Sequence, residues 1–314
     1  MKLGIIAAAT QRGLGVQSRS VYNALHPHVT VVVDPGPGRI PRMPVHPEWY
    51  PDGHVIEWRP DGTLPGAADL LSDCDVVWTA ETFYDWTIPD VLANRGVRTV
   101  CHVNPELYHG TPECVALWLP STWMRHQFPD APVLITPAPL ERYPDLPPLD
   151  PEPRIVHQAG TGPAGDRQGT TLLERCAPKL ARNGITVDIQ SQHERVRGRR
   201  VSEPWDGDAG AWMAVLPRRY GGQSLAASGW LAAGIPVAMP NIAPQATDWP
   251  IVPIPHKRSR DVHLKSGLIQ TVTRVITDTK RLPEHRERAR SWAEANSWAA
   301  WESKWWEAFR SLVD

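Results

Sequence analysis

The chain has 314 residues, of which 41% are hydrophobic and 21% are charged, and its formal net charge is −1. This length suits two domains better than one, and no apolar run approaches the roughly 18 to 20 residues that span a bilayer. The near-zero charge excludes a strong attraction of the whole molecule to nucleic acid or membranes, although a local basic patch stays open.

The cysteines and the amino terminus favour a cytoplasmic protein. Cys74, Cys101, Cys114 and Cys176 form no C-x-x-C pair and no disulfide-like spacing, as expected for free thiols in a reducing compartment. The apolar stretch after Met1 is short and leads into a glycine loop, so we interpret it as a first strand and not as a signal peptide. The twelve histidines carry no metal-binding motif, and no bound metal is expected.

Short β-branched segments alternate with helical segments in the first half of the chain, which is typical of a parallel sheet with helices on both faces. Strands are expected at 3–8, 29–33, 76–79, 98–102, 116–119 and 133–136. Helices are expected at 15–25, 86–95 and 122–128, whereas the Pro- and Gly-rich segment 34–65 is expected to form loops.

A proline-dense segment follows, and it suits a linker because prolines interrupt both sheets and helices. The alternation then restarts, with strands expected at 154–159, 186–190, 212–216 and 236–239 and helices at 170–183 and 223–233. We predict an N-terminal α/β domain over 1–143, a linker over 144–153 and a C-terminal α/β domain over 154–296.

The last segment, 297–314, is expected to be a helix that joins the first domain. Trp298, Trp301, Trp305 and Phe309 would lie on one of its faces. Docking of this aromatic stripe into a groove is the favoured interpretation, and a stacking surface for sugars or bases is the alternative.

In open parallel sheets, ligands bind beyond the carboxyl ends of the strands, and the loop after the first strand carries Gly13 and Gly15 there. Glycines let backbone approach a ligand, and the start of the following helix offers amides to an anion. Asp34 has the position of a ribose-binding acid, but Ser18 replaces the third glycine of a dinucleotide fingerprint. A loop that faces a sugar nucleotide is therefore favoured over a simple tight turn and over NAD binding.

Two later loops carry arginines before a helix. Arg167 could direct its planar fork of donors to a diphosphate, or pair with a local carboxylate instead. The second of these loops joins two arginines to a glycine pair that opens a helix, which predicts a phosphate cradle. Its candidate donor-binding residues are Arg218, Arg219, Gly221, Gly222, Gln223 and Ser224.

The order and spacing of these elements resemble GT-B glycosyltransferases, most of all the retaining family 4. The similar segments are 13–15, 117–123, 133–143, 166–170 and 217–237, and together they cover most of the chain. The resemblance implies two Rossmann-like domains that face each other across a cleft, with a C-terminal helix that packs back towards the first domain. It also implies that the second domain binds the nucleotide-sugar donor and the first domain binds the acceptor.

The chain departs from the family at its donor site. The family's two glutamates fall at Gly221 and Gly229, and the second of them usually holds the donor ribose. The family's lysine is replaced by Gln168. We hypothesise that Arg218 and Arg219 compensate, which would shift donor recognition from the ribose towards the phosphates.

Acid–base candidates follow two strands of the first domain, namely Glu81 and Asp85 after one and His102 and Glu106 after the next. Such side chains could accept the proton of an acceptor hydroxyl. Loop packing without catalysis is the weightier alternative for each, and a retaining reaction needs no dedicated base.

The leading hypothesis is metal-independent transfer of a sugar from a nucleotide-diphosphate sugar, acting as co-substrate, to a hydroxyl acceptor. The acceptor could be a hydroxymethylated base in DNA, since basic runs at 195–200 and 257–260 could hold phosphates unless they are solvated loops. The missing glutamates leave open a non-catalytic nucleotide- or glycan-binding protein. Gly13, Gly15 and Asp34 leave open a nucleotide-dependent oxidoreductase.

Overall fold

The computed structural model describes residues 1–11, 13–35, 45–104, 108, 110–122, 125–159, 166–191, 200–201, 210–218, 223–242, 249–255 and 261–314. Within these ranges, no helix combines the length and the apolar character that a membrane crossing requires. The chain divides into two compact units, of which the first comprises Met1–Thr136 with Trp301–Asp314 and the second comprises Pro137–Ala300.

The first unit contains a six-stranded sheet of parallel strands in the order β3-β2-β1-β4-β5-β6. Its strands are β1 (Leu3–Ala8), β2 (Val29–Asp34), β3 (His54–Glu57), β4 (Val76–Ala80), β5 (Arg98–His102) and β6 (Val115–Trp118). Its helices are α1 (Gly13–Leu25), α2 (Ala67–Leu70), α3 (Ile88–Ala93) and most of α9 (Trp298–Arg310), with short 3-10 turns at Pro47–Trp49 and Arg125–Gln127. After β1 the chain adds β2 and β3 on one side of it, and then crosses to add β4, β5 and β6 on the other side. The sheet is therefore doubly wound.

Most of the expected elements of this unit are confirmed, and three differ from the prediction. In the described part of the segment 122–128, which was expected to be a helix, there is only the 3-10 turn Arg125–Gln127. The edge strand β3 lies in the segment 34–65 that was expected to be loops, because three of its four residues are exposed and give no apolar pattern. The strand expected at 133–136 is reduced to a single bridge between Val133 and Leu119.

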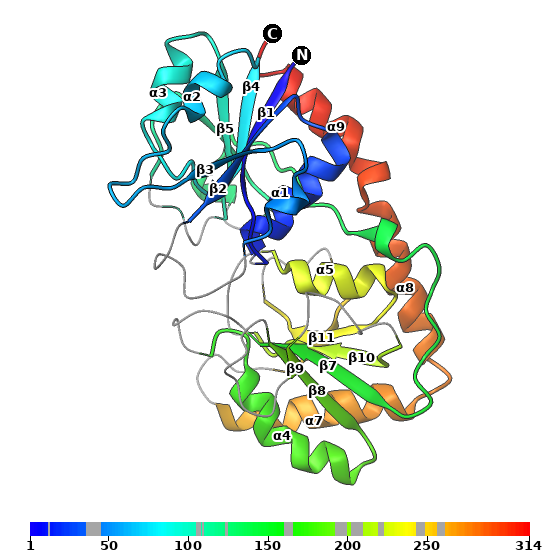
Figure 1. Ribbon diagram of the computed structural model, residues 1–314. Helices are drawn as coiled ribbons and strands as arrows, with labels where there is room; N and C mark the ends of the chain where they lie inside the picture. The colour runs from blue at the N-terminus through cyan, green and yellow to red at the C-terminus, as the bar shows by residue number, and fades with distance from the viewer. Residues whose placement is uncertain are drawn as a thin grey trace. The chain divides into compact units, whose positions relative to one another are not determined.

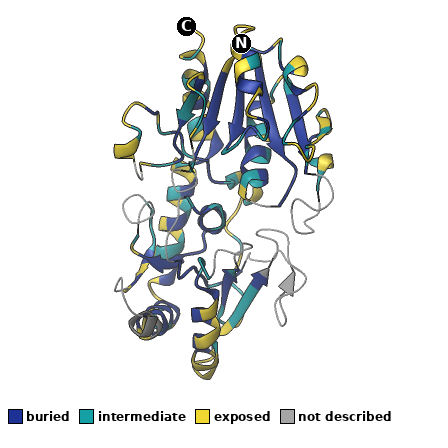
Figure 2. Cartoon of the chain, turned by 90° about the vertical axis from the view of Figure 1, so that its left-hand side faces the viewer, coloured by how far each residue is buried: buried dark blue, intermediate teal, exposed yellow. Residues whose placement is uncertain are grey.

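Helices cover both faces of the first sheet, as Figure 1 shows, with α2 and α3 on one face and α1 and α9 on the other. Alternate strand residues face the two layers, so Val77 packs towards α2 and α3 while Trp78 meets α9. Figure 2 shows the consequence, with buried strands in dark blue between helices whose outer sides are exposed.

An aromatic cluster anchors α9 to this sheet. The Trp305 ring lies 6.0 Å from Trp78, 5.8 Å from Trp118 and 5.3 Å from His102, in each case edge to face. Trp305 and Phe309 have exposures of 0%, so docking of these two members of the predicted stripe is confirmed. Each such ring pair is worth about 0.5–1.5 kcal/mol beyond the area that it buries.

The second unit repeats the architecture with a parallel sheet in the order β12-β11-β10-β7-β8-β9. Its strands are β7 (Arg154–Gln158), β8 (Thr186–Ser191), β9 (Arg200–Val201), β10 (Met213–Val215), β11 (Val237–Pro240) and β12 (Val252–Ile254). Its helices are α4 (Thr170–Arg182), α5 (Leu225–Ala232), α7 (Asp261–Thr277) and α8 (Leu282–Ala295), with a 3-10 turn at Leu140–Arg142. The predicted fold class, α/β with two Rossmann-like sheets, is confirmed.

Two arginines of α8 bind the start of the proline-rich segment. The Arg290 guanidinium donates to the carbonyl oxygens of Tyr143, of Pro144 at 3.0 Å and of Ala232 at 3.2 Å. Arg286 donates to the carbonyl oxygen of Pro147 and at 3.4 Å to that of Gly234. The residues expected to form a free linker are therefore packed on the second unit at this end.

Replacement of Arg290 by alanine should loosen this segment. The side chain is 15% exposed, and its loss leaves three carbonyl groups without their donor, which we expect to cost about 1–3 kcal/mol. Hydrogen exchange of peptides that cover 143–147, together with thermal unfolding, would measure the effect.

Arg281→Ala on the same helix is the matched control, since that side chain is 67% exposed and only pairs with Glu284. We expect it to change the free energy of unfolding by less than about 0.5 kcal/mol. Equal effects of the two replacements would contradict the anchoring role of Arg290.

Candidate functional site

The loop between β1 and α1 is closed by a backbone contact at Gly15. A Cβ atom on Gly15 would lie 1.8 Å from the carbonyl oxygen of Thr10, so any larger residue would force the loop and the helix apart. This contact alone accounts for a glycine at position 15, while Gly13 begins α1. Leu14, between the two glycines, faces the pocket described next.

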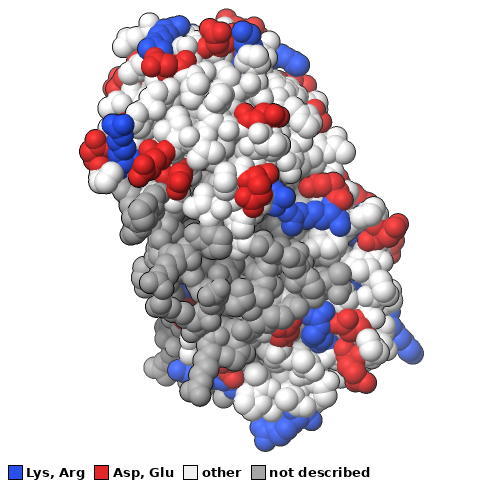
Figure 3. Space-filling view, in the orientation of Figure 1, with Lys and Arg blue, Asp and Glu red and all other residues white. Residues whose placement is uncertain are grey.

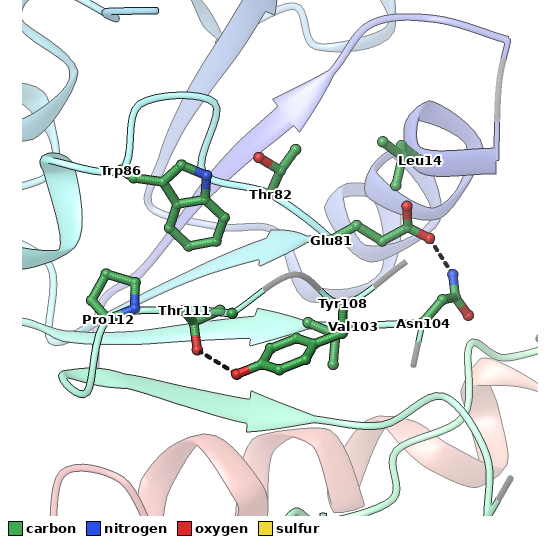
Figure 4. A pocket seen from close by; sticks show the side chains of 10 residues that line it. Leu14, Glu81, Thr82, Trp86, Val103, Asn104, Tyr108, Thr111 and Pro112 are labelled. Carbon is green, nitrogen blue, oxygen red and sulfur yellow. Dashed lines mark hydrogen bonds between the residues drawn. The ribbon is translucent and has the colours of Figure 1, made fainter. Parts of the chain in front are cut away.

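A pocket of about 540 Å³ lies in the first unit, at the carboxyl ends of β4 and β5. Glu81 comes directly after β4, and Asn104 comes two residues after β5. Figure 4 shows their side chains on one side of the pocket, with Trp86 and Tyr108 on other sides. This is the edge of a parallel sheet at which ligands bind.

Glu81 is held in an uncommon conformation at the pocket. Its φ of 61° is left-handed, a region that residues with a Cβ rarely adopt. Its backbone N–H donates to the carbonyl oxygen of His102 at 3.0 Å, and the Asn104 amide donates to its Oε1 atom. Backbone strain of this kind often marks functional positions. The predicted candidate Glu81 thus faces a pocket with its carboxylate oriented by Asn104.

Asp85 lies four residues further but has a different environment. It is 7% exposed, and its carboxylate accepts from the Leu64 N–H at 2.9 Å and from the N–H and hydroxyl of Thr87 at 3.0 and 2.7 Å. These bonds connect the segment before α2 with the segment before α3. The carboxylate of Asp85 therefore stabilises loop structure. The fourth candidate, Glu106, lies outside the described residues.

His102 is buried beneath α9, with an exposure of 1%. The Gln17 amide donates to its Nδ1 atom at 2.8 Å, which places the ring proton on Nε2. Backbone groups of Leu119 and Leu134 lie near the ring, and Nε2 is buried without a hydrogen-bond partner among the described residues. Burial lowers the pKa of His102 from 6.5 to about 4, so the ring is neutral at neutral pH. Its surroundings are those of a core residue.

The second unit brings two of its predicted loops into contact. Gly169 adopts φ +75° at the start of α4, and a Cβ atom there would lie 2.2 Å from the carbonyl oxygen of Pro217. Nearby, the fully buried His157 donates from Nδ1 to the Val215 carbonyl at 2.8 Å and accepts from the Thr170 hydroxyl at 2.8 Å. The loops that follow β7 and β10 are thus tied together.

Arg218 lies next to this contact and is 4% exposed. A guanidinium that is so deeply buried keeps its charge and needs polar or anionic partners. Arg167 is partly exposed at the entrance of α4, and the buried Oε1 atom of Gln168 has no hydrogen-bond partner among the described residues. Predicted residues from two loops therefore meet at one edge of the sheet.

The start of α5 completes this edge. Ser224 is the N-cap of the helix, and its hydroxyl accepts from the Ala227 N–H at 3.3 Å. The first turn of a helix has backbone amides without intrahelical partners, which suits an anion. Gln223, just before the cap, is partly exposed. The candidates Arg219, Gly221 and Gly222 lie outside the described residues.

Sequence reasoning missed several residues of the first pocket, among them Trp86, Asn104 and Tyr108. Asn104 follows β5 as Glu81 follows β4, and that position was the one signal that could have identified it. In the described ranges, no group of three His, Cys, Asp or Glu residues has an arrangement that could hold a metal ion.

Replacement of Gly169 by alanine should be more costly than the same change at Gly184. Both glycines have nearly the same φ, 75° and 74°, but only Gly169 has a backbone atom where the Cβ would lie. Each alanine should cost about 1 kcal/mol through its left-handed conformation. The overlap with Pro217 should add at least about 1–2 kcal/mol at Gly169 only. Equal unfolding free energies of the two variants would contradict the contact.

Burial of neutral His102 predicts that acid weakens the fold. Below pH 6.5 the unfolded chain takes up a proton here, whereas the folded ring stays neutral until about pH 4, so stability falls as pH falls through this window. The contribution is fully present above pH 6.5 and its loss reaches on the order of 3 kcal/mol.

Urea unfolding at several pH values would measure this loss in the protein and in a His102→Asn variant. The asparagine amide oxygen can still accept from Gln17 but does not titrate. The variant should lose less stability between neutral pH and pH 4.5 than the protein with His102. Parallel pH dependences would contradict the prediction.

No family model matches the sequence, and no curated protein matches it. Solved structures are nevertheless similar over the whole chain. A glycosyltransferase from Rickettsia africae ESF-5 has a TM-score of 0.67 and 13% identity, with coverage of 100% of this chain and 98% of that one. Anabaena HepE in complex with UDP-glucose has a TM-score of 0.70 and 11% identity, with coverage of 99% and 100%.

An alpha-glucosyltransferase in complex with UDP and a 13-mer DNA that contains an HMU base is also similar, with a TM-score of 0.66 and 10% identity. The match covers 99% of each chain. At such identities a likeness establishes fold and leaves function to be argued from the site. The chain has the GT-B fold of these glycosyltransferases.

Proposed function

We propose that the chain is a glycosyltransferase that moves a sugar from a nucleotide-diphosphate sugar to a hydroxyl acceptor. The observation that carries the proposal is the buried guanidinium of Arg218 beside the contact between Gly169 and Pro217. It lies at the carboxyl edge of a parallel sheet, where phosphates bind next to helix starts. The similarity to a structure with bound UDP-glucose supports the nature of the donor.

The donor would be held through its diphosphate. A charge kept away from water acts on phosphates more strongly than an exposed one, and a guanidinium offers two parallel donors to phosphate oxygens. Arg167 and the first turn of α5 would add further donors. Such a cradle would make up for the absence of acidic residues at Gly221 and Gly229.

Transfer would proceed as follows. The acceptor oxygen forms a bond to the anomeric carbon, and the bond between that carbon and the phosphate oxygen breaks with its electron pair on the diphosphate. Arg218 stabilises the negative charge that develops on the leaving group. The hydroxyl proton passes to Glu81 if the reaction inverts configuration, or to the departing diphosphate if it retains configuration.

A second candidate is transfer to a hydroxymethylated base in DNA, favoured by the similarity to the alpha-glucosyltransferase in complex with DNA. The basic runs expected to bind phosphates, at 195–200 and 257–260, lie outside the described residues except for Arg200 in β9. On the face drawn in Figure 3, the basic residues in colour lie singly or in small groups among acidic ones. Duplex DNA that carries the modified base, tested as acceptor at several salt concentrations, would separate the two candidates.

Calorimetry with UDP-glucose and other nucleotide sugars tests the donor site. Replacement of Arg218 by glutamine should weaken the preferred donor about 10- to 100-fold, because a charge-assisted hydrogen bond is worth about 1.5–3 kcal/mol. Arg218→Lys should restore only part of the affinity, since a lysine lacks the planar fork.

Arg154→Gln is the matched control. Arg154 is 20% exposed and pairs with Asp150 at 2.6 Å and with Asp188 at 3.3 Å. It starts β7 and thus lies at the amino edge of the same sheet. Its loss should lower stability and leave donor affinity unchanged. Unchanged affinity in Arg218→Gln would refute the cradle, and a panel without any bound nucleotide would favour a non-catalytic protein.

A further inference from the structure

The pocket of the first unit has one apolar aromatic wall. Trp86 is 37% exposed, and no other tryptophan, tyrosine or phenylalanine side chain among the described residues is as exposed. Phe83 packs edge to face against it, with 5.7 Å between ring centroids. The indole is therefore fixed from one side while its pocket side stays open (Figure 4). An exposed, fixed ring gains stability when a flat apolar face covers it.

The opposite wall presents oxygen atoms that accept hydrogen bonds. The Asn104 amide donates to one oxygen of the Glu81 carboxylate and so orients this carboxylate at the pocket. The hydroxyl groups of Tyr108 and Thr111 lie 3.4 Å apart at the floor. A carboxylate accepts hydrogen bonds, and the hydroxyl groups of a ligand donate them.

The charges of the lining residues restrict the class of ligand further. No lysine or arginine occurs among the described residues that line this pocket, and Glu81 is the charged residue among them. A phosphate held in this space would meet a carboxylate without a compensating cation, which costs free energy. The lining therefore suits a neutral ligand and opposes a nucleic-acid strand.

We infer that this pocket binds a neutral sugar as the acceptor, with the apolar face of its ring against Trp86 and its hydroxyl groups on the carboxylate of Glu81. A pyranose ring offers one apolar C–H face and several hydroxyl donors at its edge, which matches the two walls. The inference rests on the proposed function only in calling the sugar an acceptor, because binding of a sugar to the pocket can be measured without a donor.

Saturation-transfer NMR with neutral methyl hexosides and their disaccharides tests this binding in the full chain, with and without UDP. Trp86→Ala should weaken the best sugar at least about fivefold, and Trp86→Phe should recover most of the loss. Trp301 is a partly exposed tryptophan of the same unit, and Lys304 lies over its ring. The control Trp301→Ala should leave sugar binding unchanged. Equal binding by the Trp86→Ala variant, or no sugar bound by the wild-type chain, would overturn the inference.

Transfer assays separate this inference from the proposed function. With a donor that binds, neutral sugars should be glycosylated in preference to duplex DNA, and Glu81→Gln should raise the KM for the sugar. Glycosylation of DNA alone, with donor affinity intact, would overturn the sugar pocket and leave the glycosyltransferase proposal standing. Sugar binding without any donor binding would support the sugar pocket and contradict the glycosyltransferase proposal.

Discussion

Close backbone contacts at the carboxyl edges of the two sheets determine where ligands can bind. In the second unit, Gly169 brings the entrance of α4 against Pro217, and in the first, Gly15 brings the start of α1 against Thr10. Both contacts are made by backbone atoms, so no change of side-chain rotamer could remove the overlap that a residue larger than glycine would cause. The positions of Arg218 and Leu14 follow from these two contacts, and the two candidate sites depend on them.

Much of the fold could be predicted because buried parallel strands consist of short apolar runs. The exposed strand β3 gave no such signal, since it pairs only along one edge. The segment after β6 showed the opposite error, because Val133 and its neighbours are apolar but the sheet ends at β6. An apolar run predicts that a segment is buried, but a buried segment need not pair with a neighbouring strand.

The candidate site could be predicted only in part, for a reason that the first unit makes plain. Glu81, Asp85 and His102 all follow or end a strand at the same edge, and their positions in the sequence look equivalent. Only the folded loops decide that Asp85 receives three hydrogen bonds, that His102 faces α9, and that Glu81 faces a pocket. Trp86 and Asn104 belong to the same pocket through tertiary contacts that no local pattern encodes.

The docking of α9 also has a consequence for biosynthesis. Trp305 and Phe309 fill the core of the first unit, although they follow the whole second unit in the sequence. Domains generally fold as their sequence emerges. The first unit to be synthesised would then be the last to complete its core. Until α9 has been synthesised, Trp78 and Trp118 would lack the aromatic rings that cover them.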